Sequence, residues 1–143
     1  MIDRNAIITH CAAATPEQAI IAAGEALRET GACDSGYVQA MVDNFRQFGP
    51  YFVIAPGLAM PHARPEQGAI KAQISLVRLT TPLAFDHDEN DPVTVLIGLS
   101  ATSSNNHIAL IQQIVTVLAD TQKRDLLLTS RDRETLFQLF QSP

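Results

Sequence analysis

Cysteine is scarce in this sequence of 143 residues, which contains only Cys11 and Cys33. The two lie far apart and form no CxxC pair. This spacing excludes a disulfide framework and a cysteine-based zinc site. Both cysteines are interpreted as small, partly buried side chains in a reducing compartment.

Basic clusters and long hydrophobic runs are absent as well. The formal net charge is −5 and no run of Lys and Arg occurs, so we expect no nucleic-acid partner. No segment reaches the ~20 apolar residues that a membrane-spanning helix needs, so we expect no direct membrane insertion. The N-terminal stretch lacks the apolar core of a signal peptide, and the predicted location is the cytoplasm.

The sequence motifs of several large enzyme classes are also missing. No GxSxG, P-loop, GxGxxG or HExxH pattern occurs. Their absence argues against classical hydrolases, NTPases and dinucleotide-dependent enzymes. Any chemistry must therefore come from another arrangement of side chains.

The residues that are present predict one globular domain over residues 1–143, with 46% hydrophobic and 17% charged residues. Strands and helices alternate in mixed order, which predicts an α/β fold with a mixed β-sheet flanked by α-helices. Thr15 and Ser130 are the expected N-caps of the first and last helices. The expected strands are 6–11, 51–54, 72–79 and 93–99, and the expected helices lie within 15–31, 34–49, 107–120, 121–130 and 130–140.

The segment APGLAMPHARPEQG, residues 55–68, surrounds His62 with three prolines and two glycines. Proline restricts φ, whereas glycine adopts φ values that other residues disfavour. The segment therefore predicts a stiff irregular loop. His62 is a candidate nucleophile or general base, because imidazole titrates near pH ~6.5. Arg64 can bind an anion through two parallel hydrogen bonds. A histidine that is hydrogen-bonded only for structure remains the alternative.

His107 lies where the polar loop 100–106 becomes a helix, with Asn105 or Asn106 as the expected cap. A helix start has free N–H groups and a positive dipole, which attract phosphate and disfavour protonated imidazole. A neutral His107 that donates a hydrogen bond to an anion fits this position. An ordinary exposed residue of the first turn is the alternative.

The other two histidines are interpreted as structural. His87 lies in an acidic segment, residues 86–91, whose spacing matches no calcium loop, so a solvated turn is favoured over a metal site. His10 lies late in the expected first strand.

The run PGLAMPHARPE resembles the active-site segment of the fructose/mannitol superfamily (type 2) of enzyme IIA components of the bacterial phosphoenolpyruvate-dependent sugar phosphotransferase system. The longer run GPYFVIAPGLAMPHARPEQGA, residues 49–69, is similar to the ascorbate and cryptic-mannitol branch. The run NDPVTVLIGLSATSSNNHIALIQQIV, residues 90–115, resembles the same family. The resemblance extends over essentially the whole chain.

This resemblance implies an α/β fold and a phosphocarrier activity. Members accept a phosphoryl group from the phosphohistidine carrier HPr onto one histidine and pass it to an enzyme IIB, which uses a cysteine in this branch. Membrane enzyme IIC then couples the transfer to sugar uptake. His62 matches the phosphorylated histidine and His107 the second active-site histidine. The branch favours ascorbate or a polyol as the transported substrate.

The same activity leads to expectations about the surroundings of His62. Arg64 is expected to bind the phosphoryl group, contact a partner or hold the loop through a carboxylate. Neither a metal nor a cofactor is expected for the transfer. Further donors are expected among Ser100, Thr102 and Ser103. Leu58, Met60 and Phe52 are expected to form an apolar rim, with core packing of the loop as the alternative, above all for Phe52.

Two alternatives remain open from the sequence. A regulatory enzyme IIA-like domain would be phosphorylated in the same way without serving transport. A metal-dependent hydrolase would need His62, His107 and the acidic segment 86–91 around one metal ion.

Overall fold

The computed structural model describes residues 2–141. Over that range the chain forms five strands, five α-helices and one short 3₁₀ helix. In chain order these are β1 (Ile2–Cys11), α1 (Pro16–Glu29), α2 (Ser35–Phe48), β2 (Val53–Ala55), β3 (Leu58–Ala59), η1 (Pro65–Gln67), β4 (Gln73–Leu83), β5 (Val93–Ser100), α3 (Ser104–Ala119), α4 (Thr121–Thr129) and α5 (Arg133–Leu139).

The strands form one sheet in the order β1-β4-β5-β3-β2. β1 is parallel to β4 and β3 is parallel to β5, whereas β4–β5 and β2–β3 are antiparallel pairs. The sheet is therefore mixed, and the predicted α/β fold class is confirmed. It forms a single domain.

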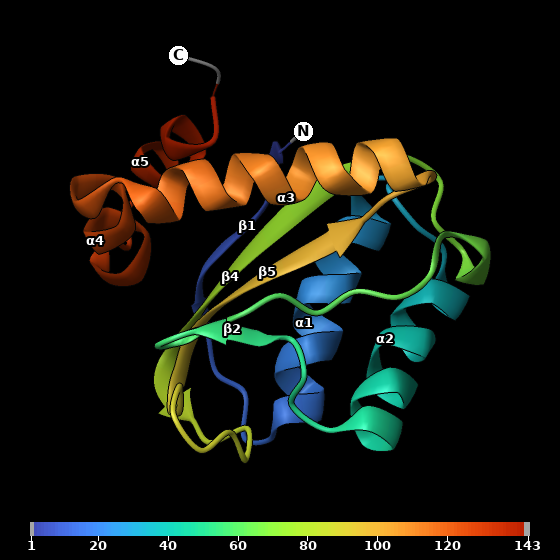
Figure 1. The fold of residues 1–143 in the computed structure, drawn as a ribbon, viewed down its shortest axis with the longest axis horizontal. Helices are drawn as coiled ribbons and strands as arrows, with labels where there is room; N and C mark the ends of the chain where they lie inside the picture. Colours follow the sequence, from blue (N-terminus) through green and yellow to red (C-terminus); the bar gives the residue numbers. More distant parts are fainter. Residues whose placement is uncertain (1, 142–143) are drawn as a thin grey trace.

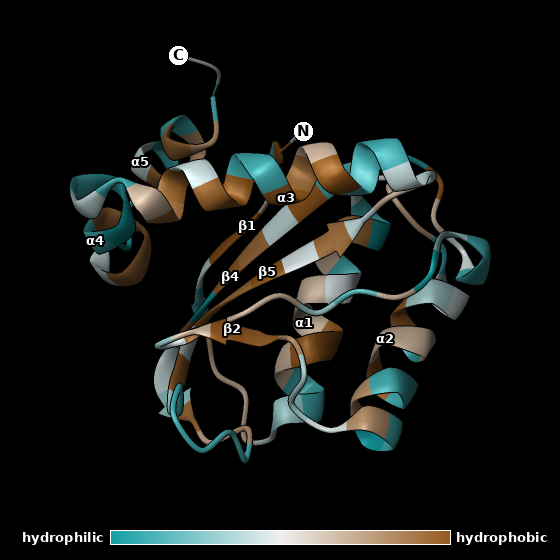
Figure 2. Cartoon of the chain, viewed as in Figure 1, coloured by the Kyte–Doolittle hydropathy of each residue, from teal (hydrophilic) through white to brown (hydrophobic). Residues whose placement is uncertain are grey.

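Helices cover both faces of the sheet, with α1 and α2 on one face and α3, α4 and α5 on the other (Figure 1). The strands between them are largely hydrophobic (Figure 2). Alternate β5 side chains enter opposite cores: Leu96 packs with α1 and α2, and Ile97 packs with α3. Covering on both faces explains why the sequence of this strand is almost continuously apolar.

The strand boundaries differ from the prediction at several places. β1 begins at Ile2 rather than at residue 6, and β4 continues to Leu83, into the segment 81–92 that was expected to be a loop. β2 spans Val53–Ala55 rather than 51–54. The two-residue strand β3 was not predicted, because hydrophobic periodicity cannot reveal so short an element.

The helices agree more closely with the prediction. Thr15 caps α1 as expected, with its hydroxyl accepting from the Gln18 N–H at 3.2 Å. The predicted caps of two other helices are wrong. α3 is capped by Ser103 instead of Asn105 or Asn106, four residues before the predicted helix begins at residue 107, and α5 is capped by Asp132 instead of Ser130. Several polar residues precede each of these helices, and all of them suit the N-cap position.

The backbone of residues 55–68 is irregular, as its prolines and glycines predicted. Gly57 has φ of 80° and Gly68 has φ of 130°, values that side chains disfavour. Between them, β3 pairs with Val95 and Leu96 of β5. Because β3 and β5 are parallel, both chains leave the sheet at the same edge. This brings the loop that follows β3 beside the start of α3 (Figure 1).

Candidate functional site

His62 lies in the loop after β3, with its side chain half-buried. It forms an isolated parallel bridge with Leu99, near the end of β5. The Leu99 N–H donates to the Pro61 carbonyl at 3.1 Å. The loop is therefore attached to the central sheet at the residue before the histidine.

The His62 ring has a defined hydrogen bond. Its Nδ1 lies 2.9 Å from the backbone carbonyl oxygen of Met60. A carbonyl oxygen can only accept, so Nδ1 carries the proton. In the neutral ring Nε2 then holds the free electron pair and is the nucleophilic atom. This contact could not be predicted from the sequence, because any residue supplies a backbone carbonyl.

His107 lies beside His62 although the two residues are far apart in the chain. Their ring centroids are 5.6 Å apart and the rings are inclined by 57°. His107 is the fourth residue of α3, one position beyond the cap-bonded Asn106, and is partly buried rather than exposed. The structure thus brings the two predicted site histidines together.

The surroundings of the His107 imidazole favour its neutral form. Burial and, secondly, the nearby His62 lower the pKa of His107 below its ordinary value of 6.5. Burial disfavours the imidazolium because it removes water from the charge. At neutral pH His107 therefore offers one N–H donor without a positive charge.

We expect the His107 imidazole to titrate below pH 6.5 in a two-dimensional NMR titration of the ring nitrogens. His62→Gln raises the pKa of His107 only part of the way, since burial is the larger cause. Unfolded His107 binds its proton at higher pH than folded His107. As the pH is lowered from about 6.5 to the pKa of folded His107, the free energy of unfolding therefore decreases. A His107 pKa at or above 6.5 would contradict this assignment.

The two histidines line an open pocket of about 1000 Å³. Arg64 lines the same pocket and is exposed. The first turn of α3 forms another side of it through Ser103 and Ser104. The first intrahelical bond of α3 runs from the His107 N–H to the Ser103 carbonyl at 3.0 Å, so the N–H groups of Ser104 and Asn105 have no intrahelical partner. All three predicted site residues therefore lie around one pocket.

Of the three predicted hydroxyl donors, only Ser103 lies at the pocket. Ser100 is fully buried and donates towards the carbonyls of Lys71 and Ala32, at 2.6 and 3.3 Å, so its prediction as a site donor is wrong. Thr102 is held outside the pocket wall, where its hydroxyl accepts from the Asn106 amide at 2.9 Å.

The predicted apolar rim is wrong for Leu58 and Met60, and for Phe52 the alternative of core packing is confirmed. Leu58, Met60 and Phe52 are buried in the core, where they anchor the loop. The exposed apolar side chains at the pocket are instead those of Phe48, Tyr51 and Ile108, which are 60%, 46% and 52% exposed. Phe48 and Tyr51 flank a turn after α2, and nothing in the local sequence distinguishes them from core aromatics.

In the described part of the chain, Arg64 does not hold the loop through an ion pair with a carboxylate, which was one of its three expected roles. Of the three salt bridges within residues 2–141, none includes Arg64. The loop is closed instead by the Arg64 N–H, which donates to the Gln67 side-chain oxygen at 2.9 Å. The guanidinium is thus available at the pocket.

His87 and His10 lie away from this pocket, as expected of structural residues. The His87 Nδ1 accepts from the Asn90 N–H at 3.0 Å and stabilises the turn. Within the described residues, no three His, Cys, Asp or Glu side chains are grouped to hold a metal ion. The metal-dependent hydrolase therefore lacks its ligand cluster in this part of the chain.

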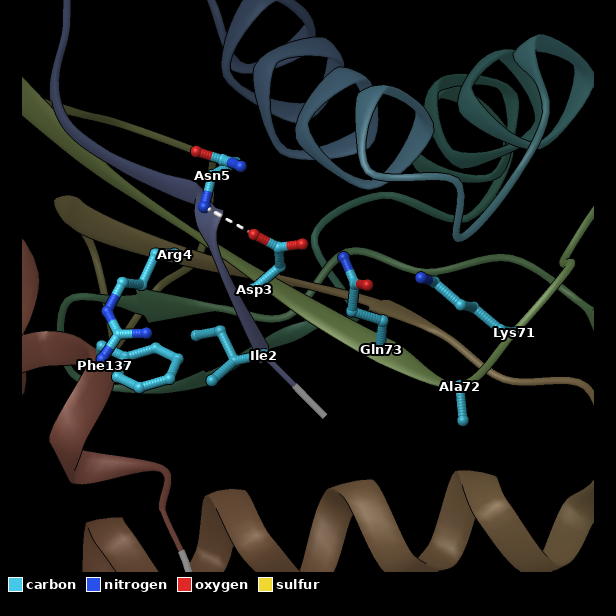
Figure 3. A pocket seen from close by; sticks show the side chains of 8 residues that line it. All are labelled: Ile2, Asp3, Arg4, Asn5, Lys71, Ala72, Gln73 and Phe137. Carbon is cyan, nitrogen blue, oxygen red and sulfur yellow. Dashed lines mark hydrogen bonds between the residues drawn. The ribbon is translucent and has the colours of Figure 1, made fainter.

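A second pocket, of about 660 Å³, lies between the starts of β1 and β4 and α5 (Figure 3). Its Arg4 guanidinium is already paired with the Glu134 carboxylate, at 2.9 Å for both bonds, and lies over the Phe137 ring. Lys71 and Gln73 line its other side. This pocket contains no nucleophilic side chain comparable with His62.

Two imidazoles, the start of α3 and the Arg64 guanidinium thus meet around one pocket at the edge of the sheet. Comparison with known proteins gives the family. Residues 1–142 match the family described as phosphoenolpyruvate-dependent sugar phosphotransferase system, EIIA 2. The chain belongs to this family, whose members are phosphoryl-transferring components of the phosphotransferase system.

Relatives of known name support the predicted branch. The chain is 50% identical over 104 residues to the ascorbate-specific PTS system EIIA component of Escherichia coli K12, covering 72% of this chain and 68% of the relative. It is 41% identical over 140 residues to the Salmonella typhimurium protein of the same name, covering 97% and 91% of the two chains.

Solved structures show the same fold. The solution structure of the mannitol-specific cryptic phosphotransferase enzyme IIA from Escherichia coli has a TM-score of 0.81 at 34% identity, covering 94% of this chain and 89% of that one. Enzyme IIA for mannitol, in a complex with phosphorylated enzyme IIB from Escherichia coli, also has a TM-score of 0.81, at 26% identity and 98% coverage of both chains. No helix in residues 2–141 is long and apolar enough to cross a membrane.

Proposed function

We propose that this chain acts in the cytoplasm as a phosphocarrier, as one enzyme IIA domain over its whole length. It accepts a phosphoryl group from phospho-HPr onto His62 and passes it to the cysteine of a cognate enzyme IIB, which serves membrane enzyme IIC. The observation that carries the proposal is the hydrogen bond from His62 Nδ1 to the Met60 carbonyl, which leaves Nε2 free beside His107.

The transfer follows from this tautomer. The Nε2 electron pair of His62 attacks phosphorus, and the N–P bond of the donor phosphohistidine breaks as its electrons return to the donor ring. The Met60 carbonyl accepts from the Nδ1–H throughout and stabilises the positive charge that the ring gains. In the second step the thiolate of enzyme IIB attacks phosphorus, and the electrons of the Nε2–P bond return to His62.

Charge on the equatorial phosphoryl oxygens is the main quantity to stabilise in such a reaction. Neutral His107 supplies an N–H donor, and the free N–H groups of Ser104 and Asn105 supply the positive end of the α3 dipole. Arg64 is the cationic side chain at the pocket. We assign it the role of binding the phosphoryl group, because its guanidinium is not engaged by a carboxylate.

Arg64→Ala is expected to slow phosphoryl transfer about tenfold, the effect of losing one exposed charge-assisted contact. If Arg64 binds the phosphoryl group, kcat falls and the Michaelis constant for HPr stays the same. Arg64→Lys, which keeps the charge but not the two parallel donors, gives an intermediate rate. An effect confined to the Michaelis constant would instead assign Arg64 to partner docking.

The pocket is open enough for two partners in turn. Phe48, Tyr51 and Ile108 give its mouth an apolar border, which suits brief contact with another protein surface. The solved complex of the mannitol-type relative with phosphorylated enzyme IIB supports an enzyme IIB as one of these partners.

We propose ascorbate as the substrate of the transport system, because the ascorbate-specific relatives share up to half of their aligned residues with this chain. The regulatory alternative differs in what happens after phosphorylation. A transport component is discharged by its enzyme IIB, whereas a regulatory domain keeps its phosphate and binds another protein.

The experiment supplies phosphoenolpyruvate, enzyme I and HPr and follows acid-labile phosphate on this chain. An ascorbate-type enzyme IIB is then added. Phosphorylation followed by discharge within seconds supports the transport role. Phosphorylation without discharge would favour the regulatory role, and no phosphorylation would overturn the proposed function.

A further inference from the structure

Tyr37, a residue of α2, has its hydroxyl at the His62 loop although its side chain is fully buried. The hydroxyl lies 2.7 Å from the Leu99 carbonyl and accepts from the Ala63 N–H at 3.1 Å. Ala63 directly follows His62, and His62 forms the isolated bridge with Leu99 of β5. One side chain thus connects α2, the loop and the central strand.

The position of this hydroxyl is unusual for a parallel pairing. On one side of His62 the Leu99 N–H donates directly to the Pro61 carbonyl. On the other side the expected partner of the Ala63 N–H is the Leu99 carbonyl. The Tyr37 hydroxyl contacts both of these groups, accepting from the Ala63 N–H at 3.1 Å and lying 2.7 Å from the Leu99 carbonyl, the shorter of its two contacts to carbonyl oxygens; the Ala63 carbonyl lies 3.1 Å away. It thereby fastens the loop to the end of β5, beside the bridge between His62 and Leu99.

We propose that Tyr37 is a positioning residue for phosphoryl transfer, holding His62 at its separation from His107 through the Ala63–hydroxyl–Leu99 bridge. This inference rests on the proposed function. β5 ends at Ser100 and α3 begins at Ser104, so the strand end that holds the His62 loop also precedes the helix of His107. A shift of the loop against Leu99 therefore changes the distance between the two rings.

Removal of the hydroxyl leaves two backbone groups without their partner. In Tyr37→Phe the Ala63 N–H and the Leu99 carbonyl either stay unpaired in a buried place or pair directly, which draws the loop towards β5. Either result alters the Met60–His62 geometry that fixes the ring tautomer. Burial also raises the pKa of Tyr37 to about 12, so the hydroxyl remains a donor at physiological pH.

The test compares Tyr37→Phe with Ser75→Ala. Ser75 is a matched control, because its fully buried hydroxyl donates to the Ala23 carbonyl at 2.8 Å, away from the pocket. We expect Tyr37→Phe to lower kcat for phosphoryl transfer from HPr about tenfold, with the Michaelis constant unchanged because no partner can touch Tyr37. Ser75→Ala keeps the wild-type kcat. Equal losses in both variants, or none in Tyr37→Phe, would overturn the proposal.

Ring-nitrogen NMR of the unphosphorylated protein separates this inference from the proposed function. Wild-type His62 shows the Nδ1–H tautomer, and Tyr37→Phe shifts it towards a mixture with Nε2–H and weakens contacts between the two rings. An unchanged tautomer in Tyr37→Phe refutes positioning, whatever the phosphorylation result. In the wild type the Ala63 amide must exchange slowly with solvent, and rapid exchange would also refute the proposal, even if the variant fails to fold.

Discussion

His62→Ala is expected to lose phosphoryl acceptance completely, with at least a 10³-fold drop in the rate of labelling, because the covalent nucleophile is removed. The imidazole is half-buried at the edge of the pocket and lies outside the main cores, so the variant keeps its fold. Labelling with phosphoenolpyruvate, enzyme I and HPr measures the effect, and circular dichroism checks the fold.

His10→Ala is the matched control for this experiment. His10 is an exposed histidine of β1, bonded through Nδ1 to the Thr9 hydroxyl at 3.0 Å and not part of the pocket. The control variant should be labelled like the wild type. If His62→Ala carries as much acid-labile phosphate as His10→Ala, the phosphorylated histidine has been assigned wrongly.

His107→Ala has the second largest expected effect, a reduction of about 10² in the rate of transfer to His62, as found when one preorganised donor to developing charge is removed. His62 remains the phosphorylated residue, so labelling reaches completion slowly. The loss arises because the His107 ring, which offers an N–H donor, lies beside the His62 ring at 5.6 Å between centroids.

His107→Gln distinguishes a donor role from a packing role. Glutamine keeps an uncharged N–H donor at the same helix position and should recover part of the rate. Alanine and glutamine variants with equal rates would show that hydrogen-bond donation by this side chain does not matter. A wild-type rate in His107→Ala would remove His107 from the site altogether.

Much of the site could be predicted from the sequence. The prolines and glycines of residues 55–68 indicated a stiff irregular loop, and its backbone is irregular, with Gly57 and Gly68 at positive φ. The apolar run of β5 followed by a polar segment located His107 near a helix start. These predictions succeeded because they depend on local backbone restriction and hydrophobic periodicity, which are properties of short segments.

Other parts of the site could not be predicted in this way. Leu58, Met60 and Phe52 are apolar residues near His62 in the chain, and all three turned inwards. The exposed border of the pocket comes instead from the end of α2, the turn after it and α3. Whether an apolar side chain is buried depends on the layer packed above it, and that layer consists of distant segments.

By itself the sequence predicted the fold class, most of the elements, the irregular loop and His62 as the candidate reactive side chain, since each follows from residues adjacent in the chain. Only the tertiary structure decided how that side chain can act. Parallel pairing of β3 with β5 placed His62 beside His107. The Met60 carbonyl selected the tautomer and the buried Tyr37 hydroxyl holds the loop to Leu99. These contacts join distant segments or use backbone atoms, and neither leaves a pattern in the sequence.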